Sequence, residues 1–147
     1  MTEIPQNDEV NRIYCLYGKA AHHCFNIELS CAFLLRGPEW RKNHKLSELT
    51  PEIIHTIANK LDRSTLGQLI NKINVHFSLT SDDELYLEKV LDKRNYLTHE
   101  FFGTYGKRMY LPETWPEMID ELQKLLRFFE EASTLLEKWS GINQEDI

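Results

Sequence analysis

Two side chains in the second half of the chain are of types that carry out acid–base chemistry on anionic substrates. Arg94 and His99 stand five positions apart in a segment with helical character, and Asn95 follows the arginine directly. A guanidinium stays charged and its planar fork matches a phosphate, while an imidazole can accept or donate a proton near neutral pH. Asn95 and His99 are four residues apart on one helix face. Asn95 is thus placed to orient the imidazole, whereas Arg94 and His99, about 140° apart on an ideal helix, do not share a face. The three are candidates for a catalytic site, and the spacing alone is weak evidence for one.

The charge of Arg94 does not fit its position. On an ideal helix, with about 100° per residue, Arg94 lies in the middle of an apolar face, and burying a guanidinium without an anionic partner is costly. Either Arg94 pairs with a buried acid on another helix, for which Glu28 is the candidate, or it reaches the rim and binds an anionic substrate group. Both can hold at once. The apolar face consists of Leu87, Val90, Leu91, Leu97, Thr98 and Phe101.

A long helix is predicted at the start of the chain, over residues 8 to 35. Apolar or small residues recur there every three or four positions, which is typical of a helix packed along one side. Arg36, Gly37 and Pro38 predict its end, because glycine favours a helix C-terminus and proline cannot continue the hydrogen-bonded ladder. The recurring residues are Val10, Ile13, Tyr17, Ala20, Cys24, Ile27, Cys31 and Leu34.

A basic connector is expected from residue 36 to 50. It contains Arg41 and Lys42, which form either a solvated loop or part of a nucleic-acid surface. We take Arg41, Lys42 and Lys93 as weaker candidates for substrate contacts.

Four further helices are predicted from capping signals. Thr50 followed by Pro51 opens a short helix that reaches about residue 60, and Ser64 caps the next. Ser81 with Glu84 forms a capping box, whose helix runs through the Arg94 segment to residue 103. The last helix begins near residue 116 and ends at Gly141.

Two long apolar seams with shorter helices between them, and no alternating strand pattern, predict an all-α fold. We expect an antiparallel, up-and-down bundle of four to five helices, formed by residues 1–147 as a single domain. No stretch approaches the roughly 20 apolar residues of a membrane-spanning helix, and no targeting segment is recognisable, so a cytoplasmic protein is expected.

Composition narrows the function classes. A net charge of -6 argues against a general nucleic-acid coating protein, so any RNA contact must use a local basic patch. The three cysteines, Cys15, Cys24 and Cys31, lack metal-site or disulfide spacing and are expected in the core. No cluster of metal ligands is recognisable, and we expect neither a metal nor a cofactor.

The string from Arg94 to Phe102, RNYLTHEFF, resembles the Arg-polar-x3-His motif of the HEPN superfamily. The segment from Ser64 to Ile70 also resembles one that precedes this motif in small bacterial members. The resemblance covers most of the chain in helix order, but only about nine residues as a specific motif. One HEPN subgroup has a tyrosine two residues after the histidine, where this chain has Phe101, which puts that subgroup's regulatory tyrosine modification in doubt.

The resemblance implies a metal-independent ribonuclease that works as a homodimer, with two motifs facing one another across a composite cleft. Arg94 would hold the scissile phosphate, Asn95 would be the polar residue after it, and His99 would assist attack by the ribose 2′-hydroxyl or protonate the leaving oxygen. RNA is the implied substrate, and an antitoxin or regulatory protein is a possible partner. Two alternatives stay open: a non-catalytic HEPN module that mediates interactions or binds a nucleotide, and a purely structural bundle within a larger assembly.

Overall fold

The structure, a computed structural model, describes residues 3–103 and 106–141. Over these ranges the chain is helical and contains no β-strand. The predicted all-α bundle is confirmed. Its helices are α1 (Asp8–Asn43), α2 (Pro51–Asp62), α3 (Leu66–His76), α4 (Ser81–Asn95) and α5 (Trp115–Ser140), with a π-helical turn η2 (Tyr96–Glu100) directly after α4 and short 3-10 turns at Leu46–Glu48, Gly106–Tyr110 and Pro112–Thr114.

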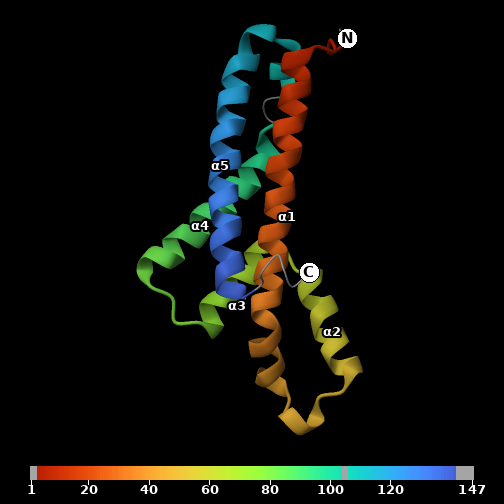
Figure 1. Ribbon diagram of the computed structural model, residues 1–147, viewed down its shortest axis with the longest axis vertical. Helices are drawn as coiled ribbons and strands as arrows, with labels where there is room; N and C mark the ends of the chain where they lie inside the picture. Colours follow the sequence, from red (N-terminus) through yellow and green to blue (C-terminus); the bar gives the residue numbers. More distant parts are fainter. Residues whose placement is uncertain (1–2, 104–105, 142–147) are drawn as a thin grey trace.

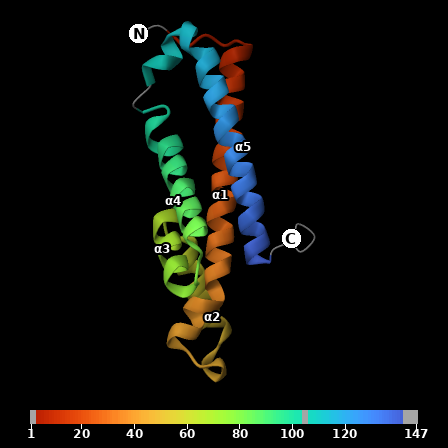
Figure 2. The same cartoon turned by 90° about the vertical axis from the view of Figure 1, so that its left-hand side faces the viewer.

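The two longest helices, α1 and α5, lie side by side and run in the same direction (Figure 1). His23 Nε2 of α1 is 3.9 Å from Glu130 Oε1 of α5, and each residue lies equally far from the start of its own helix. Helix α4 runs in the opposite direction beside them (Figure 2). Accordingly Arg94 contacts Glu28, while the later residue Leu97 accepts a hydrogen bond from the earlier residue Tyr17.

The core follows the two predicted apolar seams. In α1 the side chains that face α4 and α5 are buried. In α5 the predicted seam is buried from Trp115 to Leu136, and its last predicted residue, Trp139, is partly buried. Burial of such side chains is the main stabilising term of a helical bundle. The buried seam of α5 consists of Trp115, Met118, Leu122, Leu125, Phe129, Ala132 and Leu136.

Helix α1 is longer than predicted, because it continues through Pro38 to Asn43. The prediction of a connector from residue 36 was therefore wrong for its first turns. Pro38 lacks an N–H and cannot donate within the helix, but tertiary contacts offset this loss. Glu39 forms an ion pair with Lys72 of α3, with 2.8 Å between Glu39 Oε1 and Lys72 Nζ. Trp40 borders a groove shared with α2.

Two helix starts differ by one residue from the prediction. Thr65, not Ser64, caps α3, and it forms a reciprocal capping box with Gln68. Thr80, not Ser81, caps α4, where its hydroxyl oxygen accepts from the Asp83 N–H at 3.1 Å. The C-terminal cap of α5 is Gly141 as predicted, with a left-handed φ of 73°. Among the described residues no helix is both long and apolar enough to span a membrane.

The ion pair between Glu39 of α1 and Lys72 of α3 should make the free energy of unfolding depend on pH in the acid range. Burial acts to raise the pKa of Glu39, but the hydrogen bond and charge of Lys72, with the charges of His76 and Lys42, lower it overall. A lowered pKa in the folded state means that Glu39 stabilises the fold above its ordinary pKa and loses this contribution as the pH falls through the folded value. We expect Glu39→Gln to lower the melting temperature at pH 7 but to have little effect near pH 3. Equal effects at both values, by thermal unfolding, would contradict this assignment.

Candidate functional site: the end of α4

The Arg94 motif lies where an α-helix changes to a π-helical turn. Helix α4 ends at Asn95, and the Phe101 N–H donates to the Tyr96 carbonyl at 3.0 Å, the bond to the fifth preceding residue that defines a π turn. Phe101 is fully buried, and the Tyr17 hydroxyl donates to the Leu97 carbonyl at 3.1 Å. Both contacts fix the turn against α1. Such turns are rare and often occur at functional sites.

Arg94 forms an ion pair with Glu28, one of the two alternatives that the sequence left open. Its Nη2 is 3.1 Å from Glu28 Oε1, and the two side chains are 25% and 28% exposed, so the pair lies at the rim between α4 and α1. Its Nη1 donates to the Asn95 amide oxygen at 3.2 Å. The guanidinium is therefore held from two sides and remains partly open to solvent.

Asn95 does not orient the imidazole as predicted. Its amide oxygen is bonded to Arg94, and within the described ranges no hydrogen bond or ion pair joins the His99 imidazole to another side chain. A charged guanidinium is a stronger hydrogen-bond donor than a neutral imidazole, which explains why the Asn95 amide oxygen is bonded to Arg94. Thr98, expected on the apolar face, is exposed along with His99.

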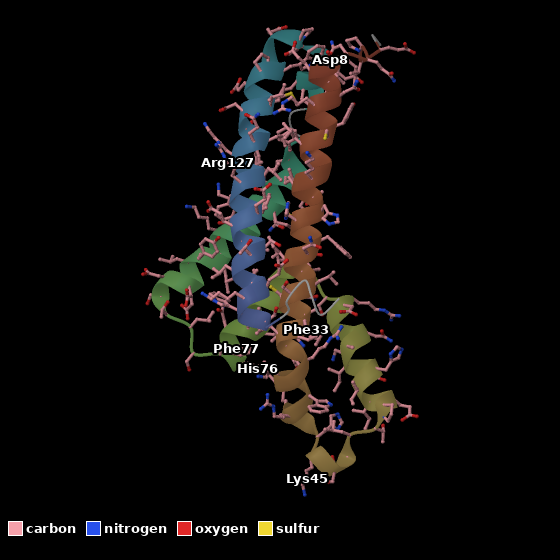
Figure 3. The ribbon with its side chains drawn as sticks, in the orientation of Figure 1. Asp8, Phe33, Lys45, His76, Phe77 and Arg127 are labelled. Carbon is pink, nitrogen blue, oxygen red and sulfur yellow. The ribbon has the colours of Figure 1, made fainter. Side chains whose placement is uncertain are left out.

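The weaker candidate residues lie away from Arg94 within one chain. Lys93 points to the other side of α4, where its Nζ is 5.1 Å from the ring centre of Phe128 on α5. Arg41 and Lys42 lie in the last turn of α1, about 20 Å along the helix from Glu28 at its usual rise. Figure 3 labels Lys45 at that end of the molecule. The structure therefore does not gather these cations around the motif.

A polar cluster that the sequence did not predict lies on the α5 side of the motif. The Tyr96 hydroxyl donates to Glu121, whose other carboxylate oxygen is 3.1 Å from Arg108 Nη1. Burial raises the pKa of Glu121. Arg108 belongs to a short 3-10 turn without helical periodicity, so only the place of Tyr96 inside the motif pointed to this cluster. It borders a pocket of about 340 Å³ lined by Asp92, Lys93, Tyr96, Glu121, Lys124 and Leu125.

A cysteine lies next to the ion pair but is a poor nucleophile. Burial, opposed by the charge of Arg94, raises the pKa of Cys24 to about 12, so its thiol is neutral at physiological pH. Burial likewise raises the pKa of Cys31 to about 12. Cys15 is exposed, which corrects the expectation that all three cysteines lie in the core.

The backbone at Gly103 lies very close to the backbone of His99. A Cβ atom at Gly103 would lie 2.5 Å from the His99 carbonyl oxygen, closer than any ordinary contact. Gly103→Ala must therefore displace the π turn, and we expect a loss of about 1–3 kcal/mol in the free energy of unfolding. At Gly18 of α1 a Cβ meets nothing within 4 Å, so Gly18→Ala should keep or raise stability. Equal melting temperatures for the two variants would contradict the close approach at Gly103.

No group of three or more His, Cys, Asp or Glu side chains that could hold a metal ion occurs among the residues described. In comparisons with known proteins, no family model, no curated protein and no solved structure matches the chain.

Proposed function

We propose that the chain is a metal-independent endoribonuclease of the HEPN type that acts as a homodimer. One observation carries the proposal: a guanidinium held in place by Glu28 and Asn95 stands shortly before an exposed imidazole in a π-helical turn. A fixed cation and a free acid–base group are the two elements that phosphodiester cleavage by an internal hydroxyl requires.

Each motif residue has a distinct role in the proposed reaction. Arg94 donates to the non-bridging oxygens of the scissile phosphate and stabilises the charge that develops there. The ribose 2′-oxygen attacks phosphorus and gives its proton to a His99 imidazole, while the bond to the 5′-oxygen breaks and this oxygen takes up a proton. The products are a 2′,3′-cyclic phosphate and a 5′-hydroxyl end, and the chemistry uses no metal or cofactor.

Two features of the single chain support the proposed homodimer. Arg94 is bound to α1 through its ion pair with Glu28. The His99 side chain is exposed, and its imidazole has no hydrogen-bond or ion-pair partner among the described residues. In a homodimer with facing motifs, two guanidinium groups and two imidazoles would line one cleft. Lys93, Arg41 and Lys42 are proposed to contact the RNA backbone outside this cleft. We further propose a cytoplasmic location, with an antitoxin or regulatory protein that restrains the activity.

The Glu28 carboxylate favours a second candidate function. It neutralises Arg94 and opposes the approach of a phosphate, as expected if the motif organises a non-catalytic HEPN module. Such a module would mediate interactions or bind a nucleotide without cleaving RNA. It predicts intact RNA together with a nucleotide-dependent rise in melting temperature.

The deciding experiment follows the ends of the cleaved RNA. We expect the purified protein to cut an end-labelled RNA in the presence of EDTA and to leave 2′,3′-cyclic phosphate ends, and to sediment as a dimer. RNA that stays intact at high protein concentration, or cleavage that leaves 3′-hydroxyl ends, would rule out the proposed reaction.

A further inference from the structure

The outer face of α1 carries large apolar side chains that the fold leaves exposed. Tyr14 and Phe25 are 50% and 57% exposed, and Leu29 and Phe33 are 44% and 43% exposed. The small residues Gly18 and Ala21 are also exposed in this stretch. We call the resulting row of residues, spaced three or four apart, the outer seam: Tyr14, Gly18, Ala21, Phe25, Leu29 and Phe33.

The outer seam lies opposite the side of α1 that faces the core. Phe25 and Leu29 each stand two residues from the fully buried Ile27, which is about 200° around the helix. Figure 1 shows α4 and α5 on one side of α1, with α2 reaching only its last part. At the first residue of the outer seam the Tyr14 ring lies 6.1 Å from the ring of Phe102, but no helix in the described ranges packs along the rest of it. Helix α1 thus has two apolar faces, of which the bundle uses one.

The exposed charged side chains that α1 itself carries along the outer seam are all positive. Between Val10 and Lys42, the acids of α1 are Glu28 and Glu39, which are partly buried and paired with Arg94 and Lys72. Every exposed charged side chain of α1 in this range is a cation, although the chain carries a net charge of -6, and one of these cations, Arg36, lies 3.8 Å from Asp62 of α2. These cations are Arg12, Lys19, Arg36, Arg41 and Lys42.

The outer seam continues into a groove between α1 and α2. The Arg36 guanidinium carbon lies 5.2 Å from the ring centre of Phe33, and Arg36 also lines the groove, which has a volume of about 230 Å³. Ile54 on the α2 side is 46% exposed. The apolar surface therefore extends past the last residue of the seam. The groove is lined by Arg36, Gly37, Trp40, Ile54, Ile57 and Ala58.

We infer that the outer seam binds an acidic amphipathic α-helix of a second protein. Apolar residues at three- and four-residue spacing match the apolar face of a partner helix, and the flanking cations select Glu and Asp beside that face. A second copy of α1 would instead bring cations against cations. The rings of Tyr14, Phe25 and Phe33 also offer stacking surfaces for bases, so single-stranded RNA is the competing occupant that the experiment below tests. This surface is separate from the proposed catalytic role of His99.

A designed peptide of three heptads tests the inference, with leucine at the apolar positions and glutamate beside them. Its binding to the full-length protein is followed by fluorescence anisotropy. We expect it to bind the wild type and to bind Leu29→Glu at least tenfold more weakly. Val75→Glu, at an 80% exposed position of α3, serves as the matched control and should bind like the wild type. The same peptide with lysine in place of glutamate should not bind, and Lys19→Glu with Arg36→Glu should reverse this preference.

Four results with the peptides and the sedimented protein would overturn the inference. These are no binding of the acidic peptide, equal binding to Leu29→Glu and Val75→Glu, equal binding of the acidic and basic peptides, and a wild-type dimer that Leu29→Glu dissociates in sedimentation. A labelled uridine oligonucleotide provides the comparison with RNA. If it binds the wild type and only Leu29→Glu abolishes this binding, the outer seam is an RNA surface and the inference fails. RNA cleavage is not a readout here, so the result is independent of the proposed ribonuclease activity.

Discussion

RNA cleavage by the His99→Ala variant is expected to fall by about 10²- to 10⁴-fold, the usual effect of removing a general acid–base group. The reason is that, in the proposed reaction, the imidazole would take the proton of the attacking 2′-hydroxyl or give one to the leaving oxygen. Stability should not change, because His99 is exposed and no described residue bonds to it. Initial rates on an end-labelled RNA and thermal unfolding of the same preparation measure the two quantities.

Two further variants test whether the RNA cleavage depends on the Arg94 and His99 side chains of the motif. His55→Ala removes an exposed imidazole from α2 and should leave the rate unchanged. Arg94→Lys keeps the charge but removes the planar fork, and its rate should fall while its Glu28 ion pair can still form. If His99→Ala and His55→Ala cleave RNA equally fast, the activity does not reside at the end of α4.

Periodicity in the sequence was sufficient to predict the bundle. The α5 seam is buried as expected, and the Arg94–Glu28 ion pair followed from placing a guanidinium on an apolar face. Both features depend on the α-helical repeat and on the cost of burying an unpaired charge. Such effects act within one helix or between one pair of side chains, so the local sequence contains them.

Tertiary contacts decided the features that the sequence did not predict. Gly37 and Pro38 are strong local stop signals, but Glu39 reaches Lys72 on α3 and helix α1 continues to Asn43. The π turn follows from contacts made by Tyr17 and Phe101 with other elements, and no local pattern predicts it. The prediction that Asn95 orients His99 failed for a different reason, because the Asn95 amide oxygen accepts a hydrogen bond from Arg94.

Phe101→Ala is expected to lower the free energy of unfolding by about 3–5 kcal/mol, as for other buried phenylalanines. The ring is fully buried directly after the π turn, with its centre 5.9 Å from that of Tyr17 and 5.0 Å from that of Phe102. Arg108 lies over it at 6.0 Å. Removing the ring frees the end of the turn that holds His99, so cleavage should fall even under conditions where the variant is folded.

Phe25→Ala provides the matched control, because it removes the same ring from a position that is 57% exposed. Its free energy of unfolding should stay within about 0.5 kcal/mol of the wild type, as is usual for surface substitutions. Urea unfolding measures both variants, with an unchanged slope required for a valid comparison. A similar loss for Phe101→Ala and Phe25→Ala would show that the π turn is not anchored by its buried ring. The position of His99 would then have to depend on the Tyr17 hydrogen bond to Leu97 instead.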